Sequence, residues 1–412
     1  MTLQPARTVA ELQELRSMTG TADGAQRVCW TDTWAEARAW LGNKLAELPV
    51  ETETDEAGNL WATLRGESER AVVIGGHIDS VPDGGWLDGC LNTLAGLESL
   101  RRIAAEGTPP VTVRLVDWAD EEGARFGRSL LGSSACAGIL EPDEVRELRD
   151  RDGVLLPDAL REHGVELDEM HQSRSQLESA AAYLELHIEQ GPVLERLGLP
   201  LGAVVGTFGV ERHLIRFTGQ AAHSGSTPMA DRRDSFAGAA RFALEVHEHT
   251  RQTGQGAVST TGSVVIKPGI VTAVAGECEI TLDQRHLAAD VLAGELAAAR
   301  AASERIAEEE RLDVEWEELW KIDPIPFDER LIDLADEAIT EVAGASHRLP
   351  SGPLHDAASV ALAEIPTVML FAQSLRGLSH TKEEDTKLEH IELSVAALDR
   401  LASKTIDLVS AS

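Results

Sequence analysis

The sequence has few of the features that mark secreted or membrane proteins. Its four cysteines are scattered without a C-x-x-C pair, which excludes a disulfide framework and a cysteine-ligated zinc site. No apolar run approaches the ~18 residues of a membrane span, and "MTLQPARTVAELQEL" lacks the apolar core of a signal peptide. We therefore expect a protein of the reducing cytoplasm.

Basic residues are also scarce, with 37 Lys and Arg against 70 Asp and Glu and a formal net charge of −33. A chain of this charge is repelled at long range by nucleic acids and by anionic membrane surfaces. Neither is an expected partner. We interpret the excess of acids as a strongly solvated surface.

The pattern along the 412 residues predicts two or three compact units. Helical periodicities alternate with short β-rich runs, which predicts an α/β domain whose mostly parallel sheet is sandwiched by helices. Amphipathic strands and two long helical stretches between residues 210 and 320 predict a smaller inserted α+β domain. The expected division is a catalytic domain of residues 1–209 and 321–412, with 210–320 as an inserted lid or dimerisation domain.

The first chemical signal is "AVVIGGHIDS", an apolar run that ends in His77 and Asp79. In open α/β sheets, ligands bind beyond the carboxyl ends of the strands. A carboxylate such as Asp79 commonly holds the second ring nitrogen of a metal-bound histidine. A turn around a buried histidine explains the same motif equally well.

Further acids and histidines follow other predicted strands or open a helix: Asp88, Glu121, Glu122, His187 and His380. An acidic run is usually a solvated loop, but this one falls at the same expected edge of the sheet. Imidazoles with carboxylates and no thiolate suit Zn²⁺ or Mn²⁺. Together with His77, these segments offer three histidines and two carboxylates as ligands, which exceed the need of one catalytic zinc and fit two ions that share a carboxylate.

These segments resemble the M20 metallopeptidase-like amidohydrolases. The resemblance is to the branch of N-carbamoyl-L-amino acid hydrolase, allantoate amidohydrolase and β-ureidopropionase. The matching stretches, in family order from about residue 60 to 385, are "GGHIDSVPDGGWLDG", "DEEGARFGRSLLGS", "LHIEQGPVLE", "GQAAHSGSTPMADRRD", "LDQRH", "SGPLHDA" and "GLSHTKEE".

The resemblance implies a site with two divalent metal ions, Zn²⁺ or Mn²⁺, with Co²⁺ or Ni²⁺ as alternatives. It implies that Asp88 bridges the ions and that Glu121 is the general base, with Asp79 as a further catalytic-site residue. The remaining ligands that it implies are His77 and His187 for one ion and Glu122 and His380 for the other.

The resemblance also implies that the inserted domain forms a homodimer and completes the site. His223 would stabilise an oxyanion, in some relatives across the dimer, and Arg285 would bind the substrate carboxylate. A surface histidine and a strand-end salt bridge are the simpler interpretations of these two residues. The weaker candidates for substrate contact are Gln190, Thr272, His355 and Arg232.

Three departures from the family pattern concern the substrate: Leu91-Asn92-Thr93 for Leu-Gly-Val, Thr272 for an asparagine, and Pro353-Leu354 for Ala-Gly. We expect hydrolysis of a linear amide or ureido C–N bond in a small carboxylate-bearing substrate, of N-carbamoyl-L-amino acid or allantoate type. An N-acyl-L-amino acid hydrolase, aminoacylase- or dipeptidase-like, is the alternative. A catalytically silent dimeric scaffold is a third interpretation, which the complete set of ligands disfavours.

Overall fold

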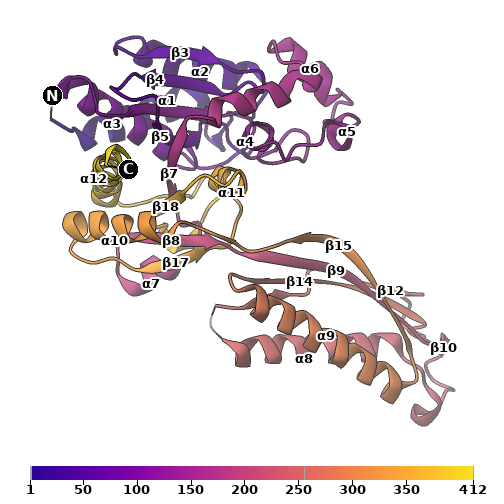
Figure 1. The fold of residues 1–412 in the computed structure, drawn as a ribbon. Coiled ribbons are helices and arrows are strands. Elements are labelled where there is room, and N and C mark those ends of the chain that lie inside the picture. The colour runs from indigo at the N-terminus through magenta and orange to yellow at the C-terminus, as the bar shows by residue number, and fades with distance from the viewer. Residues whose placement is uncertain (1, 255, 412) are drawn as a thin grey trace. The chain divides into compact units, whose positions relative to one another are not determined.

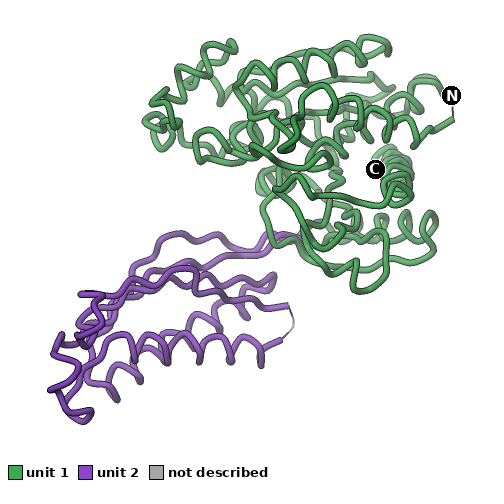
Figure 2. The backbone as a smooth tube through the Cα atoms, turned by 180° about the vertical axis from the view of Figure 1, so that it is seen from behind, with its two compact units in different colours: residues 1–205, 327–412 green, residues 206–326 purple. Residues whose placement is uncertain are grey.

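The computed structural model describes residues 2–254 and 256–411, and the chain divides into two compact units. Unit 1 ends its first segment at Val205 and resumes at Phe327, and unit 2 is Gly206–Pro326 (Figure 2). The backbone N–H of Phe327 donates to the carbonyl of Val205 at 3.1 Å. The chain thus re-enters unit 1 beside the point where it left, and unit 2 is an insertion.

The larger sheet has nine strands in the order β16-β8-β18-β7-β5-β6-β4-β3, with β17 paired to β8, and all of it except β16 and the end of β8 belongs to unit 1 (Figure 1). The strands are β3 (Glu51–Thr54), β4 (Leu60–Leu64), β5 (Ala71–His77), β6 (Thr112–Trp118), β7 (Ala180–Ile188), β8 (Leu201–Thr207), β16 (Ile325–Pro326), β17 (Arg348–Ser351) and β18 (Thr367–Ala372).

The expectation of a mostly parallel sheet is wrong, because the sheet is mixed. Only the central strands β18, β7, β5 and β6 run parallel, and the strands that flank them are antiparallel. The reason lies in the connections. A parallel pair needs a long crossover, whereas β3 and β4 are joined by a turn of only a few residues, which permits antiparallel pairing alone.

Helices cover both faces of this sheet, so β5 and β6 are buried throughout and β7 is buried from Ala182 onward. One face carries α1 (Pro5–Thr19), α3 (Cys90–Glu106), α10 (Glu329–Ala343) and α12 (Leu388–Ser410), which pack on one another and on the strands. The other carries α4 (Leu131–Ala137) and α11 (Asp356–Leu362). In β7, Glu185 is on this second face, where its carboxylate accepts the N–H of Ala357 in α11 at 2.8 Å.

Smaller elements complete unit 1. They are β1 (Gly20–Thr21), β2 (Gly24–Ala25), α2 (Asp32–Leu45), α5 (Pro142–Val145), α6 (Leu156–Glu162), the 3₁₀ helix η1 (Leu167–Leu177), α7 (Val193–Leu197) and the 3₁₀ turn η3 (Leu375–Gly377).

Unit 2 is an antiparallel five-stranded sheet with two long helices on one face. Burial alternates along its central strands, as a sheet with one covered face requires. Phe217, Phe242 and Ile306 join strand and helices in one core. The elements are β9 (Gly209–Thr218), β10 (Ala222–His223), η2 (Met229–Asp231), α8 (Ser235–Thr253), β11 (Val258–Thr260), β12 (Val264–Lys267), β13 (Ala273–Val274), β14 (Glu277–His286), α9 (Ala289–Glu310) and β15 (Asp313–Ile322).

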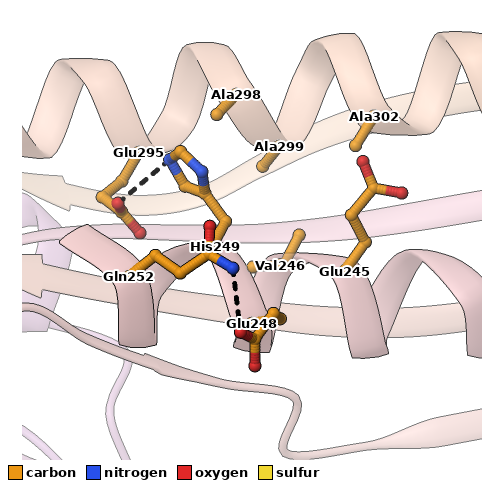
Figure 3. A pocket seen from close by; sticks show the side chains of 9 residues that line it. All are labelled: Glu245, Val246, Glu248, His249, Gln252, Glu295, Ala298, Ala299 and Ala302. Atoms are coloured by element: carbon orange, nitrogen blue, oxygen red, sulfur yellow. Dashed lines mark hydrogen bonds and ion pairs between the residues drawn. The ribbon is translucent and has the colours of Figure 1, made fainter. Parts of the chain in front are cut away.

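A cavity of about 350 Å³ lies between α8 and α9 (Figure 3). Its buried acid, Glu295, already accepts from the hydroxyls of Thr250 and Thr253 and pairs with His249 at 3.2 Å. The polar groups here satisfy one another, so we assign the cavity no ligand. No helix within the described residues combines the length and apolarity that a membrane span requires.

Candidate active site

The parallel strands at the centre of unit 1 bring the predicted residues to one edge of the sheet. His77 is the last residue of β5, and His187 is the last but one of β7. Glu121 and Glu122 follow β6, and His380 follows β18. Because parallel strands present their carboxyl ends at the same edge, four distant segments converge there.

Asp88 lies at the centre of this arrangement, just before α3. One of its carboxylate oxygens, Oδ1, is 3.0 Å from Nε2 of His187 and 3.8 Å from Nε2 of His77. The other, Oδ2, is 3.5 Å from Nε2 of His380, whose ring is also 3.3 Å from Glu122. The side chains therefore form two groups, one of His77, Asp88 and His187 and one of Asp88, Glu122 and His380.

The two buried histidines indicate whether these groups fit metal ions. Nε2 of His77 is buried without a hydrogen-bond partner, and the buried Nε2 of His187 lies 3.0 Å from the Asp88 carboxylate. The opposite nitrogens are held: Nδ1 of His77 lies 3.3 Å from Asp79, and Nδ1 of His187 lies 2.9 Å from the carbonyl of Ile188. A fixed ring whose free nitrogen faces a carboxylate is the arrangement of a metal ligand. The donor set fits divalent cations.

The electrostatics of the site depend on these close charges. Burial opposes ionisation of Asp88, but the imidazoles of His187, His77 and His380 hold its pKa far below the usual range. Burial raises the pKa of Glu121 well above its ordinary value, and His77 opposes that rise. Burial and the Asp88 carboxylate likewise raise the pKa of Glu122. Several carboxylates crowd one buried site, which indicates that positive charge belongs among them.

Asp79 links the two groups of ligands. It is fully buried, and besides its contact with His77 it accepts the backbone N–H groups of Glu121 at 3.4 Å and Glu122 at 3.2 Å. One carboxylate thus orients a histidine and the turn that carries both glutamates. Glu121 comes within 3.7 Å of Nε2 of His77 and belongs to neither group of ligands.

Two further residues, which the sequence pattern did not single out, support Asp88. The Glu384 carboxylate accepts the N–H groups of Leu87 and Asp88, both at 3.1 Å. The Ser379 hydroxyl lies 2.9 Å from Asp88 and 3.1 Å from Glu384. Burial and Asp88 raise the pKa of Glu384 to about 7. Glu384 occurs in "KEED", which is indistinguishable from a solvated acidic run, so only the fold identifies it.

Glycines permit the close approach of the two loops. A Cβ on Gly85 would lie 2.0 Å from the Glu384 carboxylate, and a Cβ on Gly89 would lie 2.3 Å from the His77 ring. Gly89 also has φ +64°, a conformation that side chains other than glycine rarely adopt. The glycines of "GGWLDG" are therefore part of the site.

Three residues around the ligands have left-handed backbone conformations although they are not glycine. Asp120 has φ 58°, Gln190 has φ 55° and His380 has φ 54°. Such conformations cost about 1 kcal/mol or more each and are concentrated at functional sites. Gln190 donates from its amide to Asp88 at 2.8 Å and to Ser379 at 3.0 Å.

His355 lies behind the first group of ligands. Its ring centroid is 4.2 Å from that of His187, and neither of its nitrogens has a hydrogen-bond partner. Burial and the neighbouring His187 hold its pKa well below the ordinary value, so it is a neutral imidazole. Among the departures, Asn92 is buried, and its side-chain oxygen accepts the N–H of Leu186 at 2.9 Å, which ties α3 to β7.

The other predicted residues lie in unit 2. His223 is exposed on the two-stranded β10–β13 ribbon, and its Nδ1 accepts the N–H of Gly225 at 3.1 Å. The next residue, Ser224, donates its N–H to the carbonyl of Thr272 and accepts from Arg232 at 2.6 Å. The fold thus places Thr272 and Arg232 beside the ribbon that carries His223. Arg285 lies on β14, where its Nε is 2.7 Å from Asp283.

Residues 73–404 match the sequence model of peptidase family M20/M25/M40. The chain is 36% identical over 367 residues to an N-carbamoyl-L-amino acid amidohydrolase of Geobacillus stearothermophilus, covering 88% of each chain. It is 32% identical to an allantoate amidohydrolase of Escherichia coli, covering 92% of each.

Among solved structures, an amidase of the hydantoinase/carbamoylase family from Burkholderia phymatum is similar over almost the whole fold. The TM-score is 0.89 at 31% identity, and the match covers 99% of both chains.

Proposed function

Since the chain belongs to peptidase family M20/M25/M40 and is a hydrolase of C–N bonds, we propose that it hydrolyses a ureido or amide bond of a small carboxylate-bearing substrate. The substrate class is an N-carbamoyl-L-amino acid or allantoate. A single observation carries the proposal: the Asp88 carboxylate is common to two separate groups of ligands. For an N-carbamoyl substrate the products are an amino acid, CO₂ and ammonia.

The cofactor in this proposal is a pair of divalent cations, Zn²⁺ or Mn²⁺, with Co²⁺ or Ni²⁺ as alternatives. His77 and His187 would hold one ion, Glu122 and His380 the other, and Asp88 both. When bound, such ions polarise the scissile carbonyl and promote deprotonation of water near neutral pH. The Nε2 atoms of the two buried histidines face the Asp88 carboxylate, which supports this assignment.

Glu121 is the general base in this proposal. Its carboxylate takes the proton of the attacking water at one oxygen and delivers it to the leaving nitrogen as the C–N bond breaks. Its position 3.7 Å from His77 and outside both groups of ligands leaves it free for this task. Asp79 fixes the backbone that carries Glu121, through the N–H that it accepts.

Unit 2 supplies the substrate contacts in this proposal. Arg285 binds the substrate carboxylate with its guanidinium, and His223 donates to the oxyanion as the carbonyl carbon becomes tetrahedral. Thr272 and Arg232, beside the ribbon that carries His223, hold the polar end of the substrate. In unit 1, His355 and Gln190 contact the substrate beside the ligands.

The hydrolysis panel that tests this function uses protein loaded with Zn²⁺, Mn²⁺ or Co²⁺. The substrates are allantoate and the N-carbamoyl, N-formyl and N-acetyl derivatives of L- and D-amino acids, with ammonia and free amine measured separately. We expect ammonia from L-configured carbamoyl substrates or from allantoate. Amine without ammonia, from N-acyl substrates only, would replace this proposal with an aminoacylase activity. Inactivity with every metal and substrate would refute both.

We also propose that the protein is a homodimer formed through unit 2. On the edge of its sheet, β12 pairs with β14 and has all four of its residues exposed, Val264 and Val265 among them. Nearby in sequence, Val271 is 99% exposed. An exposed apolar edge strand favours pairing with another chain. Solution scattering should therefore give twice the 44.3 kDa mass of one chain.

If His223 acts across that dimer, two inactive variants should complement each other. Glu121→Gln and His223→Ala, mixed and allowed to exchange subunits, should recover part of the wild-type kcat, because one site of each heterodimer has both residues intact. Mixing either variant with itself is the control. No recovery in a mixture that contains heterodimers would assign His223 to its own subunit.

A further inference from the structure

A second cavity, of about 320 Å³, lies in unit 1, outside the two groups of ligands. Three segments form its walls: the end of α1 with the β1–β2 hairpin, the loop Gly84–Trp86 before Asp88, and the loop that follows His380. Its lining residues are Arg16, Gly20, Thr21, Ala22, Gly24, Ala25, Gly84, Gly85, Trp86, Lys382 and Glu383. None of them is a proposed metal ligand, general base or substrate-contacting residue.

The charge of this cavity is unusual for the molecule. In a chain with a net charge of −33, it brings together Arg16 and Lys382 with one lining acid, Glu383. Within residues 2–254 and 256–411, no carboxylate lies within ion-pair distance of Arg16. The structure gives Lys382 one such contact, at 3.7 Å from the exposed Asp23. A long exposed pair of that kind contributes little, so both cations are available to an anion.

An aromatic side chain lies beside the cations. The Arg16 guanidinium lies 5.5 Å from the centroid of the Trp86 indole, which is almost completely buried. A guanidinium offers a planar pair of donors that matches a carboxylate, and an indole offers a flat apolar face. We propose that this cavity binds a small organic carboxylate with a planar portion, held by Arg16 and Lys382 against Trp86.

The walls of the cavity continue into the two loops that support Asp88. Trp86 precedes Asp88 by two residues, and its indole N–H donates to Asp385 at 3.3 Å. Gly85 packs against Glu384, which holds the backbone of Leu87 and Asp88. A ligand here bears on both loops at once, so occupancy lowers kcat. This effect on kcat rests on the proposed function, whereas binding itself does not.

Calorimetric titration of the metal-loaded full-length protein with benzoate tests the site. We expect two classes of binding, because a carboxylate also binds at the catalytic centre. The double variant Arg16→Gln with Lys382→Gln should weaken one class at least ~10-fold and leave the other unchanged. The matched control, Arg65→Gln with Arg330→Gln, removes the same charge from exposed ion pairs elsewhere in unit 1 and should behave as wild type.

Two further ligands separate the contributions. Benzamide has the ring without the charge and should not bind to this class of sites. Inorganic phosphate has charge without the ring and should bind more weakly than benzoate. Identical benzoate isotherms for wild type and the Arg16/Lys382 variant would overturn the proposal, as would equal binding of benzamide or of phosphate. If no substrate is found, these titrations still decide the question of binding.

Discussion

Replacing Glu121 by glutamine is expected to lower kcat at least ~10²-fold and to leave the metal content of the protein unchanged. The substitution keeps the shape of the side chain and removes its ability to accept a proton. Because Glu121 belongs to neither group of ligands, the ions should remain bound. Steady-state kinetics, with metal content measured by plasma mass spectrometry, gives both quantities on one preparation.

The neighbouring glutamate provides the matched control. Glu122→Gln makes the same chemical change one residue away, but Glu122 lies 3.3 Å from His380 in the second group of ligands. It should therefore lose metal as well as activity. If both variants kept their metal, or if Glu121→Gln retained wild-type kcat, the division of roles between the two glutamates would be wrong.

An even larger effect is expected for Asp88→Asn, because one carboxylate serves both groups of ligands. Loss of a residue that only orients a metal ligand typically costs ~10–100-fold in affinity or activity, and removal of a shared anionic ligand should cost more. We expect bound metal to fall at both positions and activity on every substrate of the panel to disappear. Dialysis followed by elemental analysis measures the first, and ammonia release the second.

Asp83→Asn is the control for this change, since Asp83 is exposed on the same loop and contacts Gln26 at 2.7 Å. It should retain metal and activity. A dialysed Asp88→Asn protein that held both ions, with a circular dichroism spectrum like wild type, would contradict the shared-carboxylate arrangement.

The central part of this fold could be predicted from the sequence because its signals are local. The run "AVVIGGH" is apolar over a full strand length, and the strand that it predicts is buried on both faces. Residues that follow such strands meet at one edge by the geometry of parallel pairing. Convergence of His77, Glu122 and His187 on Asp88 follows from that rule together with the helix that begins after Asp88.

The direction of the outer strands could not be predicted in the same way. Alternation and apolarity are the same in a parallel and an antiparallel strand, so "NLWATLRG" carries no information on direction. The short turn between β3 and β4 was the available signal. It outweighs the overall α/β texture because its length admits antiparallel pairing alone.

The residues that support Asp88 could not be predicted from the sequence, for a different reason. Glu384 and Ser379 act on Asp88 through contacts between segments almost 300 residues apart, and each is a common surface residue in its own segment. Gln190 was expected from the resemblance, but its hydrogen bond to Asp88 became visible only in the fold. The metal ligands can be predicted from the chemistry of their side chains, whereas the residues that support them can be identified only once the topology is known.

The hydrogen bond between Phe327 and Val205 indicates that unit 2 could be removed from the molecule by protein engineering. The two ends of the insertion meet, so residues 206–326 could be excised and the gap joined by a short loop, as tolerated sites of domain insertion allow. Such a minimal protein would retain every proposed metal ligand and lack Arg285 and His223. It would let the assembly of the ions be studied in isolation from the recognition of the molecule that they attack.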